Sequence, residues 1–191
     1  MQKNLDLRVQ KTYLALHNAF TDLLAEQHFE DVTLNELCER AMIRRTTFYK
    51  HFADKYEYFN FYLQEVCEEF QEKVFLEATP DDFFSYSKKM TALLLDFLRE
   101  HEAFAKNIIE SNMFPLLSNI LQSFITGEVL RMFRTYKETN RLPAFQLEGI
   151  AAFFSGGLMN TIYLMIKNDS LPSNEEFIKI ITPFLNLHLS E

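Results

Sequence analysis

The segment Ala41–Lys55 limits most strongly what this chain can fold into. It contains four cations, and its two phenylalanines, Phe48 and Phe52, are its apolar anchors. On a helix these phenylalanines share one face, whereas the threonine pair before Phe48 and the lysine after Tyr49 point away from it. A short helix with one buried seam and an outer face of hydroxyl, guanidinium and ammonium groups suits the major groove of DNA, where such donors meet phosphates and base edges.

Two further helices are expected directly before this segment. One face of a helix over about residues 7–27 carries apolar residues at alternating steps of four and three, namely Val9, Tyr13, Leu16, Phe20 and Leu23. Thr33 and Glu36 have the spacing of a capping box and open a second helix, and Met42 with Ile43 makes the following turn. Three helices, of which the last two are short and closely joined, form the helix-turn-helix arrangement.

Beyond Asp54 the pattern becomes longer and more acidic. Further helices are expected at about 55–77, 81–99, 102–111, 115–138, 144–168 and 174–188. Thr79–Asp82 and the pair Ser173 and Glu176 are start signals, and Pro183 is expected to kink or stop the last helix. With four glycines and five prolines, the chain is predicted to be all-α. A three-helix domain is expected at 1–53 and a larger helical bundle at 54–191, with most of the 20 phenylalanines in the core.

The net charge of −8 at pH 7 is unevenly distributed. Residues 1–55 contain eight Lys/Arg and eight Asp/Glu, whereas residues 56–191 contain eleven and nineteen and supply the whole −8. Within residues 40–55, five cations accompany a single acid, Asp54. The basic patch is therefore local, as in modular DNA-binding proteins.

Cys38 and Cys67 are the two cysteines, and they form no CxxC pair and no zinc-finger spacing. Both fall at positions expected inside helices, so we expect buried free thiols in a reducing cytosol. The polar N-terminus has no signal-peptide pattern. The uncharged run Gly149–Ile166 approaches the length of a membrane span, but its polar and small residues favour a fully buried or dimer-forming helix and no membrane.

The residues of the predicted helix-turn-helix resemble those of a known family. The string Thr-Phe-Tyr-x-His-Phe-x-x-Lys at 47–55, with Ala41-Met42-Ile43 and the capping Thr33 before it, is similar to the N-terminal domain of the TetR-type (tetracycline-repressor-like) transcriptional regulators. The similarity covers roughly residues 8–60. Ser155-Gly156-Gly157, followed by an apolar run, a polar break and a closing helix, also resembles the family's last two helices, which usually form a four-helix dimer interface.

The chain departs from the family string at two positions. Met42 stands where the family commonly has glycine, and methionine is less favourable than glycine if the turn needs a positive φ. Arg44 replaces the common serine cap, which removes roughly 0.5–2 kcal/mol of local stability. The pitch of the recognition helix is left open by these departures.

The resemblance implies which side chains meet DNA. Thr47, Tyr49 and His51 would face the groove, while Lys55 and Thr33 would meet phosphates. Arg44, Arg45, Thr46 and Lys50 are added from their chemistry and position. Three alternatives stay open: Tyr49 as a core residue, Lys50 as a solvated charge, and His51 as a packing residue. The predicted DNA-binding set is Thr33, Arg44, Arg45, Thr46, Thr47, Tyr49, Lys50, His51 and Lys55.

By the same resemblance, residues 1–53 would bind DNA and residues 54–191 would bind a ligand and dimerise. A homodimer would place two recognition helices about 34–36 Å apart on a palindromic double-stranded operator. A small effector would change their spacing through its differential affinity for two states. Repression is the commoner outcome in the family, and activation stays open.

Residues for the pocket and the dimer interface are also predicted. The candidate pocket residues, each with core packing as the competing interpretation, are Phe59, Phe97, Phe104, Phe124, Phe154, Asn160 and Tyr163. An aromatic and acidic domain favours a hydrophobic or cationic effector. The candidate interface residues are Phe153, Gly156, Gly157, Ile178, Ile181 and Leu185.

The sequence also bears on other classes of function. We expect no enzyme and no cofactor, because the chain has no phosphate-binding glycine loop, nucleophile elbow or HExxH motif. A metal-sensing variant would use His101, Glu102, Glu68, Glu69 and His188, but none of these has persuasive ligand spacing, and no metal is expected. The remaining alternative is a helical interaction module that binds a partner protein through the face of residues 149–166.

Overall fold

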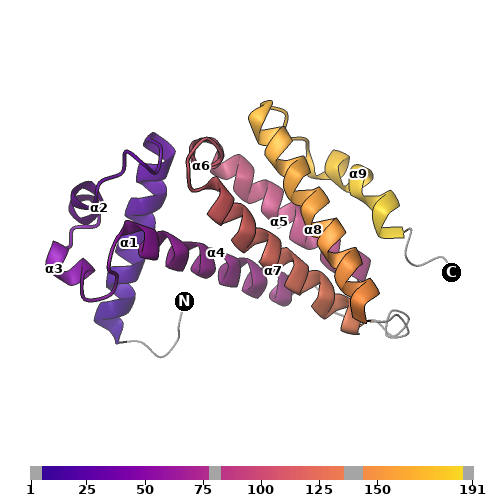
Figure 1. Ribbon diagram of the computed structural model, residues 1–191, viewed down its shortest axis with the longest axis horizontal. Coiled ribbons are helices and arrows are strands. Elements are labelled where there is room, and N and C mark those ends of the chain that lie inside the picture. The colour runs from indigo at the N-terminus through magenta and orange to yellow at the C-terminus, as the bar shows by residue number, and fades with distance from the viewer. Residues whose placement is uncertain (1–5, 78–82, 136–143, 187–191) are drawn as a thin grey trace. The chain divides into compact units, whose positions relative to one another are not determined.

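The computed structural model describes residues 6–77, 83–135 and 144–186, and all regular structure in these ranges is helical (Figure 1). The helices are α1 (Leu7–Glu26), α2 (Leu34–Arg40), α3 (Arg45–Phe48), α4 (Lys55–Glu77), α5 (Phe83–Glu100), α6 (Glu102–Ile109), α7 (Phe114–Thr135), α8 (Ala144–Lys167) and α9 (Asn174–Asn186). The prediction of an all-α protein is confirmed, with an N-terminal helix-turn-helix followed by a larger helical region.

The chain forms two compact units that are not continuous in sequence. Unit 1 comprises Met1–Glu69 and His101–Leu117, and unit 2 comprises Phe70–Glu100 and Ser118–Glu191. Helix α4 therefore contributes residues to both units, and α6 belongs with the N-terminal helices. The assignment of DNA binding to residues 1–53 and of ligand binding to residues 54–191 stays a prediction.

The predicted start of α9 is confirmed, whereas a stop at Pro183 is not. Ser173 caps α9 as predicted, since its hydroxyl accepts from the Glu176 amide at 3.3 Å and Glu176 accepts from the Ser173 amide at 2.9 Å. Pro183 does not stop α9, which continues to Asn186. Pro183 and Lys179, whose carbonyl loses its helical partner, are both exposed, so water can bind that carbonyl. The start signal Thr79–Asp82 lies outside the described residues.

The core of unit 1 is an aromatic cluster around Phe20. The ring of Phe20 lies 5.1 Å from Tyr58, 6.0 Å from Phe59 and 5.3 Å from Tyr62, centroid to centroid. All four side chains are at most 1% exposed. Burial of each such side chain contributes about 1.5–3 kcal/mol, so this cluster fixes the first part of α4 against α1.

Helix α6 is held on α1 by polar contacts as well as by packing. The Asn107 side chain donates from Nδ2 to the Leu24 carbonyl at 2.9 Å, and the Asn107 carbonyl lies 3.2 Å from Nδ1 of His28. Phe104 and Ile108 are buried on the same side of α6. These contacts explain why residues 101–117 belong to unit 1.

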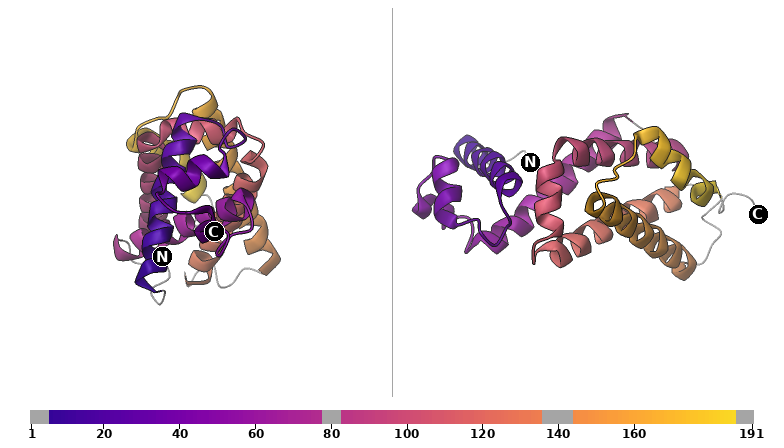
Figure 2. Two further views of the ribbon diagram at one scale, coloured as in Figure 1. Left: turned by 90° about the vertical axis from the view of Figure 1, so that its left-hand side faces the viewer. Right: turned by 90° about the horizontal axis from the view of Figure 1, so that it is seen from above.

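Unit 2 contains the last part of α4, all of α5, most of α7, and α8 and α9. Helix α5 packs on α9, and Arg99 strengthens this contact by donating to the Pro172 carbonyl at 2.8 Å and to Asn174 Oδ1 at 2.5 Å. Thr126 of α7 and Ser155 of α8 are hydrogen-bonded at 2.7 Å. Helices α8 and α9 follow each other through a short connection (Figure 2).

Candidate nucleic-acid interface

The N-terminus of α2 is fixed by the predicted capping box. The Thr33 hydroxyl oxygen accepts from the Glu36 amide at 3.2 Å, and the Glu36 carboxylate accepts from the Thr33 amide at 2.8 Å. Thr33 itself is exposed. Its position therefore allows the helix N-terminus to meet an anion, although its hydroxyl proton is already donated to Glu36 at 2.7 Å.

The turn between α2 and α3 has the hydrogen bonds of a Schellman motif. The Ile43 amide donates to the Cys38 carbonyl at 2.9 Å, and the Met42 amide donates to the Glu39 carbonyl at 3.0 Å. Met42 has φ 53° and is 91% exposed. The turn therefore needs the left-handed conformation that glycine adopts most easily, and methionine occupies it here.

Helix α3 is short, and the residue before it provides no side-chain cap. Arg44 stands at the N-cap with extended backbone and makes no side-chain cap hydrogen bond. The regular helix covers Arg45–Phe48, and turn hydrogen bonds then carry the chain to Phe52, whose amide donates to the Phe48 carbonyl at 3.0 Å. The recognition segment is thus one helical turn with a turn-like extension.

One side of the α3 segment is buried and the other is open to solvent. Phe48 and Phe52 are 0% and 5% exposed, with ring centroids 5.5 Å apart, which confirms their assignment to the core. The exposed side chains of the segment are Arg44, Arg45, Thr46, Tyr49 and Lys50, and the half-buried ones are Thr47 and His51. The predicted polar side chains are therefore gathered around one surface.

Tyr49 and Arg45 form a pair on this surface. The Arg45 Nη2 atom lies 3.5 Å from the Tyr49 hydroxyl, and the guanidinium lies 6.0 Å from the centre of the tyrosine ring. Tyr49 is 51% exposed, so it is not a core residue. The pair presents a planar cation and a phenol hydroxyl side by side, which are suitable donors for phosphate or base edges.

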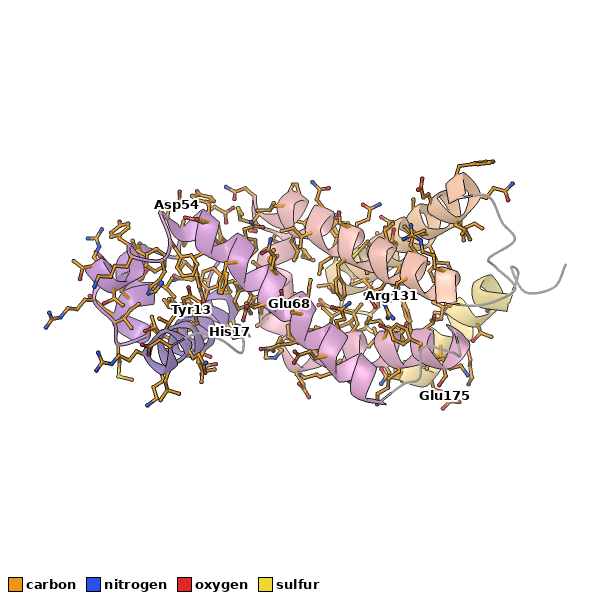
Figure 3. All side chains as sticks on the ribbon, turned by 90° about the horizontal axis from the view of Figure 1, so that it is seen from below. Tyr13, His17, Asp54, Glu68, Arg131 and Glu175 are labelled. Carbon is orange, nitrogen blue, oxygen red and sulfur yellow. The ribbon has the colours of Figure 1, made fainter. Side chains whose placement is uncertain are left out.

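His51 is anchored to α1. Its Nδ1 atom lies 3.4 Å from the Tyr13 hydroxyl, and the two rings meet edge to face at a centroid distance of 5.3 Å. Tyr13 is labelled on α1 in Figure 3. This contact leaves Nε2 as the ring nitrogen that is free for another partner in the geometry described.

Two of the cations in residues 40–55 are used within unit 1. Arg40 pairs with Glu26 through two parallel hydrogen bonds of 2.8 Å, and the Arg40 guanidinium lowers the pKa of Glu26. Lys55 donates from Nζ to three backbone carbonyls at 2.8–3.0 Å. The expected phosphate contact of Lys55 is therefore not supported by its geometry, because an ammonium group has three protons and all three are donated.

The sequence interpretation missed Asp54 as a cap. Its Oδ1 atom accepts from the Tyr56 amide at 2.9 Å and the Glu57 amide at 2.8 Å, so Asp54 starts α4 (Figure 3). Glu57 in turn accepts from the Ala53 amide at 2.5 Å. The signal was present, since an aspartate followed three residues later by a glutamate is an N-terminal helix pattern.

The predicted pocket residues are divided between the two units. Phe59 and Phe104 belong to unit 1, where both are buried against other aromatic rings. The half-buried members in unit 2 are Phe97, Phe124, Phe154 and Tyr163, whereas Asn160 is exposed on α8. The seven residues thus do not form a single cluster within one unit.

A polar cluster in unit 2 was not predicted. Glu128 of α7 is 7% exposed and accepts from the Tyr86 hydroxyl at 2.5 Å, from Gln71 at 2.7 Å and from Arg131 at 2.8 Å. Burial, followed by the hydrogen bond to Glu128, raises the pKa of Tyr86. Arg131, labelled in Figure 3, also stacks on the tyrosine ring at 5.2 Å. A glutamate three residues before an arginine in an apolar helix was the available sequence signal.

Helix α8 carries an exposed stripe at helical spacing. Phe153 is 75% exposed and Leu164 is 45% exposed, with Gly157 and Asn160 exposed between them. Of the other predicted interface residues, Gly156 and Ile178 are half-buried and Ile181 is 8% exposed. The side chain of Leu185 lies outside the described part of the structure.

The described residues contain one candidate membrane span and no candidate metal site. One helix, Phe145–Lys167, is long and apolar enough to cross a membrane by length and composition, and 22% of its most apolar window is buried. In residues 6–77, 83–135 and 144–186, no group of three or more His, Cys, Asp or Glu side chains is placed to hold a metal ion. Cys38 and Cys67 are free and buried, as predicted.

Comparison with known proteins places this arrangement in a family. Residues 18–60 match the family model described as bacterial regulatory proteins, tetR family, and residues 85–187 match a TetR model described as a transcriptional regulator C-terminal region. An uncharacterised HTH-type transcriptional regulator of Bacillus subtilis, YxbF, is 35% identical over 99 residues, a match that covers 51% of this chain and 26% of that protein.

Solved structures of regulators share the fold. The dihydroxyacetone kinase operon activator DhaS superposes with a TM-score of 0.60 at 16% identity, over 92% of this chain and 94% of that one. A Clostridium perfringens protein described as a fatty acid metabolism regulator has a TM-score of 0.61 at 20% identity, over 88% of this chain and 94% of that one. The chain therefore belongs to the TetR family of bacterial transcriptional regulators, which bind DNA operators.

Proposed function

We propose that this chain is a ligand-responsive repressor that binds a palindromic operator as a homodimer. The observation that carries the proposal is the two-sided α3 segment, with Phe48 and Phe52 buried and the cationic and hydroxyl side chains exposed. A solvated surface of this kind has no role in the core, and its donors fit phosphates and base edges.

The proposed DNA contacts fall into two groups. Tyr49, Thr47 and His51 are the proposed groove readers, and the N-terminus of α2 at Thr33 is a proposed phosphate site. The cations and hydroxyl that complete the surface are Arg44, Arg45, Thr46 and Lys50. Lys55 is left out of this set because its ammonium protons are donated within the protein.

The proposed dimer uses the exposed stripe of α8. Phe153 and Leu164 lie on the same helical face, and Gly157 between them allows a second helix to approach closely. Large exposed apolar side chains at helical spacing indicate an interaction surface. We propose that a second copy, and not lipid, covers this face, with Ile178 and Ile181 of α9 beside it.

The proposed effector binds in unit 2. Half-buried aromatic side chains there, including Phe97, Phe124 and Tyr163, support a hydrophobic or cationic ligand. Because α4 contains residues of both units, a ligand that favours one position of α4 would change DNA affinity by its differential affinity for the two states. A regulator of this type acts where the DNA lies, so we propose a cytoplasmic location.

Selection of bound sequences from a random DNA pool tests the proposal. The purified chain is expected to enrich an inverted repeat whose half-sites are one helical turn apart, because a two-fold dimer presents two equivalent α3 surfaces. Enrichment of a single unpaired half-site would contradict the dimer, and no enrichment over the starting pool would contradict operator binding.

A further inference from the structure

The geometry points to Lys55 as a positioning residue that holds the helix-turn-helix in shape, and not as a phosphate contact. The inference rests on the proposed function, since it concerns how the same DNA-binding surface is built. Its basis is the position of the ammonium group, which lies at the centre of the α1–α2 turn.

Three carbonyl oxygens surround Nζ of Lys55. They belong to Phe29 at 2.9 Å, Glu30 at 3.0 Å and Val32 at 2.8 Å. The ammonium also lies 4.6 Å from the centre of the Phe29 ring. Three donated hydrogen bonds use every proton that a lysine ammonium carries, so the group is already satisfied without DNA.

Lys55 is the hydrogen-bond donor to these three carbonyl groups. Phe29 and Val32 are 0% and 1% exposed, and the turn amides of Asp31 and Val32 both donate to the His28 carbonyl instead. Loss of the ammonium would remove the partners that these carbonyls have in the structure described, which is unfavourable for partly buried groups.

The charge around the lysine is consistent with an internal role. Burial lowers the pKa of Lys55, whereas the carboxylates of Glu30, Asp31 and Glu36 act in the opposite direction and favour the charged form. These acids make the surroundings of the ammonium negative, so its charge is balanced within the protein.

Lys55 connects the start of α2 with the start of α4. Val32 immediately precedes Thr33, the N-cap of α2, and Lys55 is the first residue of α4. The lysine therefore fixes the start of α2 to the start of α4, and both flank the α3 segment in the chain. Its side chain sets where the α2 N-terminus lies relative to α3.

Operator binding by two variants separates positioning from phosphate contact. A guanidinium is planar and spreads its protons in a fork, so it cannot supply three carbonyls that surround one nitrogen, but it binds phosphate at least as well as an ammonium. We expect Lys55→Gln and Lys55→Arg both to weaken operator binding about tenfold. We also expect both to leave the slope of log K against log salt at the wild-type value.

The exposed Lys50 supplies the matched control. Lys50→Gln is expected to reduce the slope by about 0.9 if this lysine neutralises a phosphate. The inference about Lys55 is overturned if Lys55→Arg binds like wild type while Lys55→Gln loses about 0.9 in slope. It is also overturned if both variants bind with wild-type affinity.

Acylation of the free wild-type chain gives a second measurement that needs no variant and no DNA. Acetic anhydride labelling, followed by peptide mass spectrometry, is expected to modify Lys50 at least about tenfold faster than Lys55, because the Lys55 nitrogen is enclosed by its acceptors. Equal rates would overturn the inference even if the variants fail to fold. Failure of the proposed function would appear separately, as absence of sequence enrichment by the wild-type chain.

Discussion

Met42 has a backbone conformation that disfavours its side chain. Its φ of 53° lies in the left-handed region, where an L side chain is disfavoured by about 1–2 kcal/mol and glycine is not. Because glycine also has more freedom in the unfolded chain, part of this gain is offset. The side chain is 91% exposed and contributes no core packing to compensate.

We therefore expect Met42→Gly to raise the free energy of unfolding by about 0.5–1 kcal/mol in urea denaturation. Glu39→Gly, at an exposed position inside α2, is the control and should lower it by about 1 kcal/mol. A loss of stability in Met42→Gly similar to that in Glu39→Gly would show that the turn does not store this strain.

His17 gives unit 1 a pH-dependent stability. Burial lowers its pKa below 6.5, the carboxylate of Glu69 acts in the opposite direction, and His101 adds to the lowering. The ring lies 4.6 Å from the ring of Tyr62, centroid to centroid. The folded state thus prefers neutral histidine, whereas the unfolded chain takes up a proton as the pH falls through about 6.5.

Because the folded state has the lower pKa for His17, it binds this proton less readily than the unfolded chain does. The contribution of His17 to the free energy of unfolding is therefore present above pH 6.5 and is lost as the pH falls from 6.5 toward the lower folded pKa. Denaturation of wild type and His17→Gln at several pH values between about 8 and 5 should show a smaller loss in the variant. If the free energy of unfolding falls equally with pH in wild type and in His17→Gln, His17 is not the source of the pH dependence.

For single residues, the sequence predicted burial and helix capping, but it did not predict the hydrogen-bond partners that come from distant segments. The burial of Phe48 and Phe52 and the capping box of Thr33 followed from spacing alone. The partners of Lys55 did not, because they come from a turn more than twenty residues earlier in the chain. Periodicity describes one element at a time and does not locate a contact between distant segments.

At the scale of elements, helix positions followed from pattern, whereas the packing partners of some helices did not. Helix α6 was expected near residues 102–111, but nothing in its own sequence assigns it to unit 1. That assignment follows from the packing of α6 on α1, where Asn107 also donates to the Leu24 carbonyl. Helix α3 is a single regular turn, Arg45–Phe48, and its length was not predicted.

The polar cluster on Glu128 joins three helices of unit 2, α4 through Gln71, α5 through Tyr86 and α7 through Glu128 and Arg131. Glu128→Ala leaves the Tyr86 hydroxyl and the Arg131 guanidinium without their shared acceptor, and the Arg131 side chain is 30% exposed. We expect a loss of about 2–3 kcal/mol in the free energy of unfolding.

The control for this prediction is Glu175→Ala. Glu175 pairs with Lys179 at 2.8 Å, but both side chains are at least 70% exposed, so the loss should stay below about 0.5 kcal/mol. Both variants are compared by urea denaturation under the same conditions. Equal losses would mean that the Glu128 cluster contributes no more than a surface ion pair.

At the scale of the whole molecule, the account requires two copies of the chain. Phe153→Glu puts a charge in the proposed α8 interface and should convert a dimer into a monomer at micromolar concentration in sedimentation velocity. Leu7→Glu is the control, because Leu7 is 65% exposed on α1 and belongs to unit 1, whereas the proposed interface residues belong to unit 2. A wild-type monomer, or equal dissociation of both variants, would contradict the interface.

If the exposed face of α3 contacts the operator, Tyr49→Ala and Thr47→Ala should each weaken operator binding. Fluorescence anisotropy with the selected operator and with a scrambled duplex of the same length measures both specific and nonspecific affinity. We predict that each variant loses about 1–3 kcal/mol of binding free energy on the operator, keeps its affinity for the scrambled duplex, and unfolds at the wild-type midpoint. Operator affinity equal to wild type in both correctly folded variants would contradict the account.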